Sequence, residues 1–245
     1  MREALLRELN QQLPLHALAD RLRLVRDVVS GPVVLTTSFG LEDQVLTHLV
    51  AEAGLDIQLV TLDTGRMFAE VYALWQQTEQ HYGVTIRPVF PEAKDVQDFV
   101  KTHGINGFYD SSEARKACCA ARKIAPLKRV LERAQLWIAG LRADQSQQRG
   151  QAEWAQYDET FGLIKVSPLL DWNRDEVLAF AQAHNVPVNP LHKQGFVSIG
   201  CAPCTRAIAA GEDERAGRWW WEQASHKECG LHMGPDGRLQ RAGTV

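Results

Sequence analysis

Short apolar runs alternate with amphipathic stretches along most of this 245-residue chain. Each run has the length of a buried strand, and the segments between them show the spacing of apolar positions that is typical of helices. Strands that alternate with helices predict βαβ units, and therefore an α/β fold with a doubly wound, mostly parallel sheet and helices on both faces. The expected strands are residues 33–37, 57–62, 84–90, 136–139 and 163–167, with helices at 41–53, 67–82 and 112–134.

The first 30 residues form a helical region of their own. Leu18, Leu22 and Val25 recur at helical spacing and make one apolar face. Pro14 is expected to divide residues 2–29 into two helices, because proline lacks the backbone N–H that a helix interior needs.

The character of the chain changes near Pro187. Before it, Asn173 and Glu176 have the spacing of a capping box, which predicts one more helix. After it, Pro, Gly, Cys and Trp become frequent and the helical periodicity fades. We therefore interpret residues 1–185 as an α/β domain and residues 186–245 as a cysteine-bearing appendage that ends in a mobile tail.

Composition narrows the classes of function. Apolar residues make up 45% of the chain, which is enough for a sizeable core. The formal net charge of −3 argues against a nucleic-acid-binding protein, because such proteins carry a basic stripe. No segment reaches the roughly 18 uncharged apolar residues that span a membrane. The start, Met1–Leu5, lacks the long apolar run of a signal peptide, so the expected compartment is the cytoplasm.

Five cysteines in a reducing compartment are more often thiols or metal ligands than structural disulfides. Cys201 and Cys204 form a CxxC motif, a spacing that serves both redox pairs and half metal sites. A redox pair of the thioredoxin kind is expected near the start of a βαβ unit. This motif lies far from the first such unit, which favours a metal site.

Cys118 and Cys119 are adjacent on a predicted helix. Neighbouring helical side chains lie about 100° apart, so both thiolates reach one centre only if the centre is broad or the helix is distorted. Zinc is small and draws on wider cysteine spacings, whereas a [4Fe–4S] cluster offers a separate iron to each cysteine. Cys118, Cys119, Cys201 and Cys204 are therefore predicted to hold an iron–sulfur cluster. Pairs of buried apolar thiols are the alternative.

Cys229 is the fifth thiol, and it lies between Lys227 and His232 in the expected tail. A nearby positive charge lowers the pKa of a thiol and raises its thiolate fraction. The neighbouring Gly230 lets a partner approach the sulfur closely. We interpret Cys229 as a reactive nucleophile, and the alternative is a chance cysteine in a tail.

Three strand ends carry turn residues that suit an anionic ligand. Thr36–Asp43 combines hydroxyls, a glycine and a helix start, which together form an anion site. Leu62–Arg66 and Gly140–Ser146 follow two other expected strands, and ligands bind at the carboxyl ends of strands in open α/β sheets. The first loop is not a Walker A motif. The alternative to an anion site is that this loop is an ordinary N-capping turn.

Basic residues accompany these loops and the cysteines. Arginine suits phosphate and sulfate because its planar fork binds two oxygens. A single such side chain is usually a solvated surface charge, so only their coincidence with the loops indicates a site. The residues are Lys123, Arg142, Arg149, Arg206, Arg215 and Arg218.

Six motifs occur together in this chain. They are Thr37-Ser38-Phe39-Gly40, Leu62-Asp63-Thr64-Gly65-Arg66, Gly140-Leu141-Arg142, Ser198–Arg206, Gly211–Trp221 and Lys227–His232. In this combination the chain resembles the adenylyl-sulfate and phosphoadenylyl-sulfate reductases over residues 30–232. Their nucleotide fold is that of the PP-loop ATP pyrophosphatases, so the resemblance implies that residues 1–185 bind an adenine nucleotide.

The resemblance also implies an activity. Relatives with the CC and CxxC cysteines carry a [4Fe–4S] cluster and mostly use adenosine 5′-phosphosulfate, so assimilatory reduction of that substrate is expected. Cys229 would attack it to give an S-sulfocysteine, Lys123 and His232 would assist, and thioredoxin or glutaredoxin would release sulfite. The implied substrate-binding residues are Thr37, Ser38, Phe39, Gly40, Asp63, Thr64, Gly65, Arg66, Gly140, Arg142, Arg149, Arg215 and Arg218.

Other functions share some of these features. Within the family, a phosphoadenylyl-sulfate reductase is the alternative, because a Ser-Phe-Gly loop also occurs there. A PP-loop ATP pyrophosphatase would need a fuller Ser-Gly-Gly-x-Asp-Ser loop and, if it acted on tRNA, a basic face. A non-catalytic iron–sulfur sensor leaves Cys229 and the three loops unexplained. A homo-oligomer is compatible with the sequence.

Overall fold

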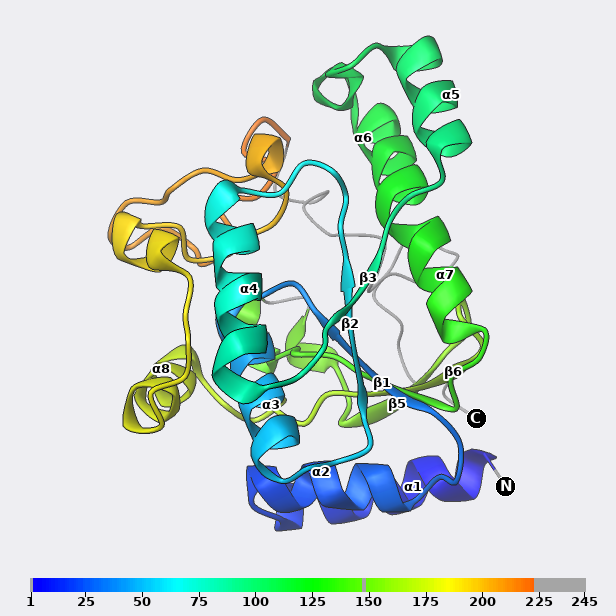
Figure 1. The fold of residues 1–245 in the computed structure, drawn as a ribbon, viewed down its shortest axis with the longest axis vertical. Coiled ribbons are helices and arrows are strands. Elements are labelled where there is room, and N and C mark those ends of the chain that lie inside the picture. The colour runs from blue at the N-terminus through cyan, green and yellow to red at the C-terminus, as the bar shows by residue number, and fades with distance from the viewer. Residues whose placement is uncertain (1, 147–148, 223–245) are drawn as a thin grey trace.

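A six-stranded sheet runs through the part of the chain that the computed structural model describes, residues 2–146 and 149–222 (Figure 1). Its strands are β1 (Val33–Thr37), β2 (Gln58–Leu62), β3 (Arg87–Val89), β4 (Leu136–Ile138), β5 (Ala155–Asp158) and β6 (Leu163–Val166). Their order across the sheet is β3-β2-β1-β4-β6-β5. All neighbours are parallel except β5, which pairs antiparallel with β6. The predicted α/β class with a mostly parallel sheet is confirmed.

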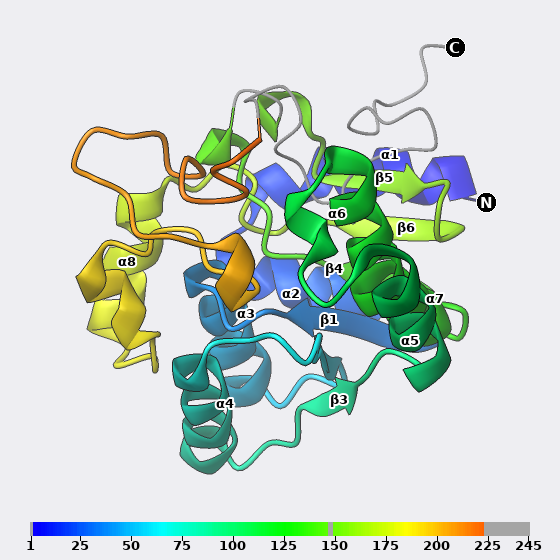
Figure 2. The same ribbon diagram turned by 90° about the horizontal axis from the view of Figure 1, so that it is seen from above.

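Helices cover both faces of the sheet (Figure 2). The α-helices are α1 (Arg2–Gln12), α2 (Leu18–Asp27), α3 (Leu41–Glu52), α4 (Ala69–Tyr82), α5 (Ala93–His103), α6 (Ser112–Cys119), α7 (Ala125–Leu131) and α8 (Arg174–Ala183). A π-helix, Ala120–Ile124, joins α6 to α7. The 3-10 helices are Leu13–Leu15, Gly107–Tyr109, Ala143–Gln145, Arg149–Gln151, Pro190–Gln194 and Ala202–Cys204.

Strand alternation divides the core into two layers. On β1, Val33 and Leu35 face the larger layer, where they pack with apolar residues of α2, α3, α4 and α8. Val34 faces the opposite layer, together with Trp137 of β4 and the apolar side of α7. Successive residues of a strand point to opposite faces, so a central strand that is buried on both sides must be apolar throughout. This explains why β1 and β4 were readable as continuous apolar runs.

Several predicted elements have the expected limits, and others differ. Pro14 does separate two N-terminal helices, and the Asn173–Glu176 capping box does open α8. The predicted strand 84–90 is reduced to Arg87–Val89 at the edge of the sheet, where Pro88 can sit because one side needs no ladder hydrogen bond. The predicted helix 112–134 is divided by the π-helix.

Two elements were not predicted from the apolar pattern. In α5, Val96, Phe99 and Val100 recur at helical spacing, so this helix does carry a local amphipathic signal, although only Phe99 is buried. The strand β5 carries polar residues and pairs only with β6 at the sheet edge. Asn10 of α1 also bonds to the backbone N–H and carbonyl of Ala155, a contact that a local pattern does not report.

The strand order reverses next to β1, because the chain passes from β1 outward to β3 and then returns to β4 on the other side. The carboxyl ends of β1 and β4 therefore lie side by side, with the loops that follow them in contact. A β-carbon at Gly140 would lie 2.4 Å from Asp43 Oδ1, so only glycine allows this approach. Ligands of open α/β sheets bind at such a reversal.

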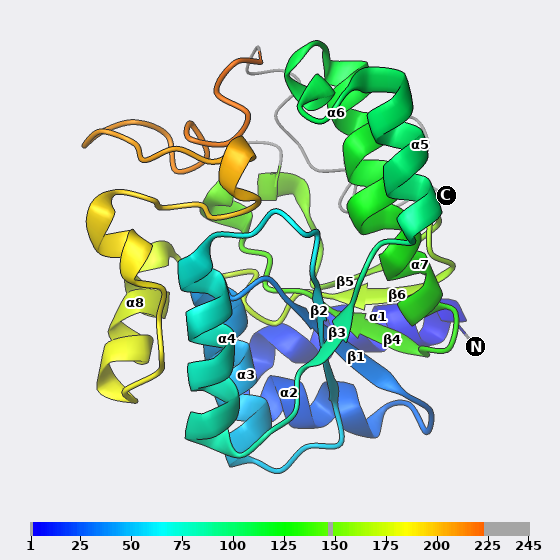
Figure 3. The ribbon, with the colours of Figure 1, turned by 45° about the horizontal axis from the view of Figure 1, so that its top comes forward.

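The segment from residue 186 to residue 222 lies over this edge of the sheet (Figure 3). It contains 3-10 turns and one isolated bridge, between Thr205 and Arg218, which fits the predicted loss of helical periodicity. Val186 joins the main core. The division into domains at residues 185 and 186 stays a prediction. Among the residues described, no helix is long and apolar enough to span a bilayer.

Candidate functional site

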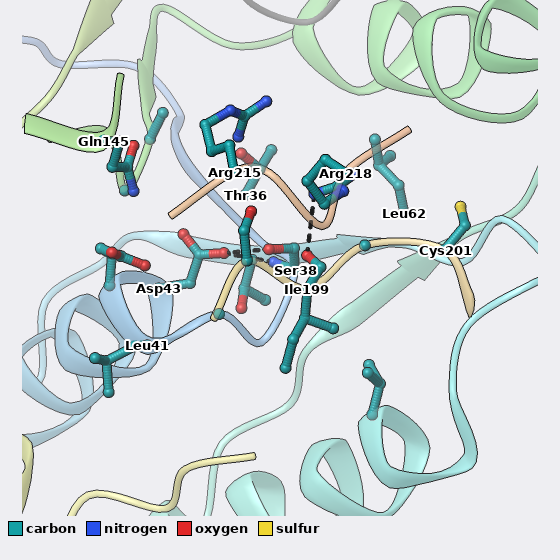
Figure 4. Close-up of a pocket in the computed structure, with 18 of the residues that line it drawn as sticks. Thr36, Ser38, Leu41, Asp43, Leu62, Gln145, Ile199, Cys201, Arg215 and Arg218 are labelled. Carbon is teal, nitrogen blue, oxygen red and sulfur yellow. Dashed lines mark hydrogen bonds between the residues drawn. The ribbon is translucent and has the colours of Figure 1, made fainter. Parts of the chain in front are cut away.

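A cavity of about 210 Å³ opens at the carboxyl edge of the sheet (Figure 4). The β1–α3 loop forms one wall, and Arg215 and Arg218 approach from the C-terminal segment. The predicted site residues that line the cavity are Thr37, Ser38, Gly40, Thr64, Lys123, Gly140, Arg149, Arg215, Arg218 and Cys201. The structure thus brings together residues from three strand-end loops, the segment after α6 and the C-terminal segment.

The predicted ligand residue Phe39 does not line this cavity. Its side chain is 1% exposed and stacks on Trp75 of α4, with ring centroids 5.7 Å apart. Its backbone has a φ of 60°, which a residue with a side chain rarely adopts. The buried ring holds this left-handed turn in place, so Phe39 shapes the loop from behind.

The carboxylate of Asp43 occupies the centre of the β1–α3 loop. It accepts hydrogen bonds from the Ser38 backbone N–H at 2.7 Å and from the Ser38 hydroxyl at 2.8 Å. Burial raises the pKa of Asp43 to about 6, and the bonds from Ser38 oppose this shift only in part. Asp43 is therefore a buried acid with a pKa close to neutrality in the wall of the cavity.

The β2–α4 loop connects the cavity to the CxxC segment. Within the loop, the Gly65 N–H donates to Asp63 Oδ1 at 2.8 Å, and Tyr72 donates to the same oxygen. The Thr64 hydroxyl lies 3.2 Å from the Cys201 sulfur. The Ala202 N–H donates to the Arg66 carbonyl at 2.8 Å. Asp63, Gly65 and Arg66 do not line this cavity. The Arg66 side chain donates to Asn106 Oδ1 at 3.1 Å and to the Ile105 carbonyl.

Arg142, another predicted ligand of the substrate, also lies outside the cavity lining. Its side chain is fully buried, and it donates to Glu42 at 2.7 Å, to both oxygens of Glu214 at 2.8 Å and to Asp144. Burial alone would lower the pKa of Arg142, but the Glu42 and Glu214 carboxylates together raise it. Arg142 thereby ties the β4 loop to α3 and to the segment that carries Arg215.

Four cysteines converge on a second, smaller cavity. Cys118, Cys119, Cys201 and Cys204 all line it, and all four are free thiols. Its wall also contains five basic side chains, those of Arg66, Arg115, Arg122, Lys123 and Arg218. Cys201, Lys123 and Arg218 line both cavities, so the two share a wall.

A π-helix brings the basic residues that follow the adjacent cysteines to the cavity that these cysteines line. It begins directly after Cys119, and its wider turn shifts the phase of the side chains that follow. Arg122 and Lys123 lie in this turn and line the cysteine cavity. Arg122 also donates to the Thr64 carbonyl at 2.7 Å. Cys118 and Cys119 themselves lie in the regular helix α6, so the π-helix changes the direction of the residues that follow the pair.

The cysteine cavity contains two thiols of raised pKa and two unpaired donors. Burial, followed by the neighbouring Cys201, raises the pKa of the Cys204 thiol to about 12. Burial also raises the pKa of Cys118, against the opposing effect of Arg122. The Nε atoms of Arg122 and Arg218 are buried without a hydrogen-bond partner among the described residues. An acceptor-rich group in this cavity would satisfy these donors.

Some predictions on the site remain without a structural test. Cys229 and His232 lie outside the described residues. Within residues 2–146 and 149–222, no three or more His, Cys, Asp or Glu side chains are arranged to hold a metal ion. The four-cysteine ligand set therefore stays a prediction, although the four side chains do share one cavity.

The sequence analysis missed several residues of the two cavities. Arg122 resembles any other basic residue of a helix until the π-helix places it. Gln145 and Glu214 take their places through the Arg142 network, and His192 comes from a 3-10 turn without a recognisable motif. Ile199 could have been found, because only Gly200 separates it from the CxxC motif.

Known proteins of similar sequence and structure agree on one family. Residues 32–207 match the model of the phosphoadenosine phosphosulfate reductase domain. The adenosine 5′-phosphosulfate reductase of Sinorhizobium fredii (strain NBRC 101917 / NGR234) is 51% identical, over 94% of this chain and 92% of its own length. The enzyme of the same name from Allochromatium vinosum is also 51% identical, over 82% of this chain and 78% of its own.

Solved structures show the same relationship. The phosphoadenylyl-sulfate reductase of Candida auris, in a phosphate complex, superposes with a TM-score of 0.69 at 25% identity. The match covers 83% of this chain and 96% of that chain. FMN adenylyltransferase of Candida glabrata shares the fold alone, with a TM-score of 0.54 at 14% identity over 92% of this chain and 77% of that one.

We predict that Arg142→Met destabilises the protein by about 3–5 kcal/mol near pH 7.5, because it leaves buried carboxylates without their partner. The loss should shrink near pH 5, because burial raises the pKa of Glu214 and the variant removes the Arg142 charge that opposes this rise, so the stranded carboxyl can then take up a proton. Chemical denaturation at both pH values measures this difference. Arg206→Met is the matched control: it breaks a pair with Glu212 that is over a third exposed, and should change stability far less. Equal free energies of unfolding for the two variants would contradict the buried network.

Proposed function

Because the chain belongs to the family of phosphoadenosine phosphosulfate reductase domains, we propose that it reduces adenosine 5′-phosphosulfate to sulfite and AMP in assimilatory sulfate reduction. The observation that carries this proposal is the wall shared by the two cavities, in which Lys123, Cys201 and Arg218 contact both spaces. A cavity suited to a nucleotide thus adjoins a cavity lined by four cysteines. Relatives that are about half identical bear the name of this activity.

The cavity has groups that suit an anionic nucleotide. The β1–α3 loop offers hydroxyls and the start of α3, and such helix starts bind phosphate. Arg149, Arg215 and Arg218 face the same space, and guanidinium groups bind phosphate and sulfate oxygens through paired hydrogen bonds. We propose that the adenosine end lies over the carboxyl edge of the sheet and that the sulfate lies near Lys123.

The chemistry begins with the thiolate of Cys229. It attacks the sulfur of the substrate, a new S–S bond forms, and the bond from sulfur to the phosphate oxygen breaks. AMP leaves with that electron pair, and an S-sulfocysteine remains on the enzyme. The surrounding cations would stabilise the charge that develops on the leaving phosphate and on the sulfonate oxygens. His232 would assist by binding the sulfonate or by tuning the thiolate.

A dithiol donor such as thioredoxin or glutaredoxin completes the reaction. One of its thiolates attacks the Cys229 sulfur, and sulfite leaves with the electron pair of the S–S bond. The second thiol of the donor resolves the mixed disulfide, which restores the Cys229 thiol and leaves the donor oxidised. The substrate sulfur gains two electrons and the dithiol loses two, as nucleophilic catalysis with a covalent intermediate requires.

The cysteine cavity fits a [4Fe–4S] cluster in its donor set. Cys118, Cys119, Cys201 and Cys204 would hold it, and thiolates are the usual ligands of such clusters. The unpaired Nε atoms of Arg122 and Arg218 are suitable donors to sulfide. When bound, the cluster would supply a charged centre and would cross-link α6 to the CxxC segment.

A phosphoadenylyl-sulfate reductase is the second candidate, because the Candida auris structure has that activity in its name and superposes well. The cavity itself favours the smaller substrate. Glu42, Asp43 and Glu214 contribute carboxylates to its lining, and a 3′-phosphate would add negative charge near them. The second candidate therefore fits this chain less well.

We expect kcat/KM for adenosine 5′-phosphosulfate to exceed that for the 3′-phosphorylated substrate by about 10-fold or more, which corresponds to about 1.4 kcal/mol in transition-state binding. Steady-state assays with both substrates and the same thioredoxin give the ratio. A ratio below one would assign the chain to the second candidate.

Cys229→Ser protein should form no covalent adduct with sulfur-labelled adenosine 5′-phosphosulfate, because serine oxygen is far less nucleophilic than a thiolate here. Single-turnover labelling without a thiol donor, followed by mass analysis, measures the adduct. Wild-type protein is the positive control, and Cys204→Ser distinguishes loss of the nucleophile from loss of a cluster ligand. Adduct formation at the normal rate by Cys229→Ser protein would exclude Cys229 as the nucleophile.

Protein purified without oxygen should contain about four iron atoms and four sulfides per chain, as a [4Fe–4S] cluster requires. Metal analysis and visible absorption measure this content. Changing any one of the four cysteines to serine should lower it, whereas Cys229→Ser should not. Zinc without iron would contradict the cluster assignment.

A further inference from the structure

A buried ion pair joins the cysteine-bearing helix to the last residue that the structure describes. Arg115 of α6 donates from Nε and Nη2 to the two carboxylate oxygens of Glu222, at 2.8 and 2.9 Å. Their side chains are 1% and 3% exposed. Two parallel bonds between a guanidinium and a carboxylate fix the relative orientation of both groups.

Stability alone does not account for this pair. Removing two charges from water costs several kcal/mol, and apolar side chains of similar volume often serve stability equally well. A buried pair does, however, specify one geometry more sharply than an apolar contact, which tolerates sliding. The positions of Arg115 and Glu222 in the chain therefore indicate which segments the ion pair orients.

Arg115 lies within one helical turn of Cys118 and lines the cysteine cavity. Glu222 lies four residues after Arg218, which lines both cavities, and seven residues before Cys229. Seven residues span at most about 25 Å when fully extended. The point at which Glu222 is fixed therefore limits the region that the Cys229 sulfur can reach.

Trp219 connects the same pair to the nucleotide cavity. Its ring is 1% exposed and lies between three guanidinium groups, with Arg115 at 4.6 Å, Arg218 at 4.7 Å and Arg215 at 5.9 Å from the ring centre. The Glu222 N–H donates to the Trp219 carbonyl at 2.9 Å, and the Trp219 N–H donates to the Cys204 carbonyl at 3.1 Å. The ion pair, the indole and the CxxC segment thus form one connected unit.

We propose that Arg115 and Glu222 are positioning residues for the covalent step, which hold the start of the segment that carries Cys229 against the cysteine-bearing helix. This inference rests on the proposed function, because it takes Cys229 as the nucleophile. Neither residue lines the cavity proposed to hold the substrate. The pair acts by fixing the origin of the segment close to Arg218, which lines both cavities, so that the chain keeps the sulfur of Cys229 within reach of them.

The test compares Glu222→Gln with Asp171→Asn. Asp171 also forms a two-bond pair, with the buried Arg21 of α2, although the Asp171 side chain itself is 46% exposed. Each variant replaces a carboxylate by an amide of the same shape, so both lose a two-bond ion pair to a buried arginine, at different places. Arg115→Lys is a second variant at the proposed site, because lysine keeps the charge but lacks the planar fork.

Three quantities are measured for each variant and for wild-type protein: iron content, the dissociation constant for AMP, and the single-turnover rate of adduct formation on Cys229. We expect Glu222→Gln and Arg115→Lys to slow adduct formation by about 10- to 100-fold, as loss of orientation does. Iron content and AMP affinity should stay within about twofold of wild type, because ground-state binding is not affected. Asp171→Asn should change none of the three.

The outcomes separate the inference from the function on which it rests. Adduct formation by Glu222→Gln and Arg115→Lys at the wild-type rate would overturn the inference alone. A parallel loss of iron or of AMP affinity in both variants would also overturn it, because the pair would then have a general structural role. Absence of an adduct on wild-type protein would instead overturn the proposed function, and the inference with it.

Discussion

Both cavities depend on the reversal of strand order beside β1. Parallel strands end at one edge, and the reversal leaves the carboxyl ends of β1 and β4 next to each other with no helix between them. Loops that begin at this edge must therefore meet, and Gly140 allows the β4 loop to lie against Asp43. The C-terminal segment and the helix that carries Cys118 then close over the same edge, which places cysteines next to a nucleotide-sized space.

Charge burial makes this arrangement specific. Arg142 replaces water around Glu42 and Glu214 with hydrogen bonds, so the β4 loop, α3 and the C-terminal segment adopt one relative position. The same segment also carries Arg215 and Arg218 to the cavity. Arg142 lies behind the cavity wall, where its guanidinium binds Glu214, the residue that directly precedes Arg215. Arg142 thus supports the fold of the wall, whereas the arginines that line the cavity are the ones proposed to bind substrate.

The sequence predicted those features that follow from local chemistry. The limits of β1 agree to the residue, and Pro14 and Asn173 act as expected, because each controls its own backbone. The strand β5 could not be predicted from its own residues, because it forms through its antiparallel pairing with β6. Arg142 lies behind the wall because it binds Glu42 and Glu214, which are far away in sequence, whereas Arg149 lines the cavity. Residue type indicated a basic site, and only packing assigned the individual roles.

The wall shared by the two cavities relates the cysteine cavity to substrate binding through charge. Lys123 and Arg218 face both cavities, so the charge of any group held by the four cysteines acts directly on the cations that would bind the substrate. Coulomb interactions at such short range are strong where water is excluded. The cysteines can thus influence the substrate through electrostatics without exchanging electrons with it. In the proposed mechanism a dithiol supplies the two electrons through Cys229, so a chain with a predicted cluster would also need a separate thiol nucleophile.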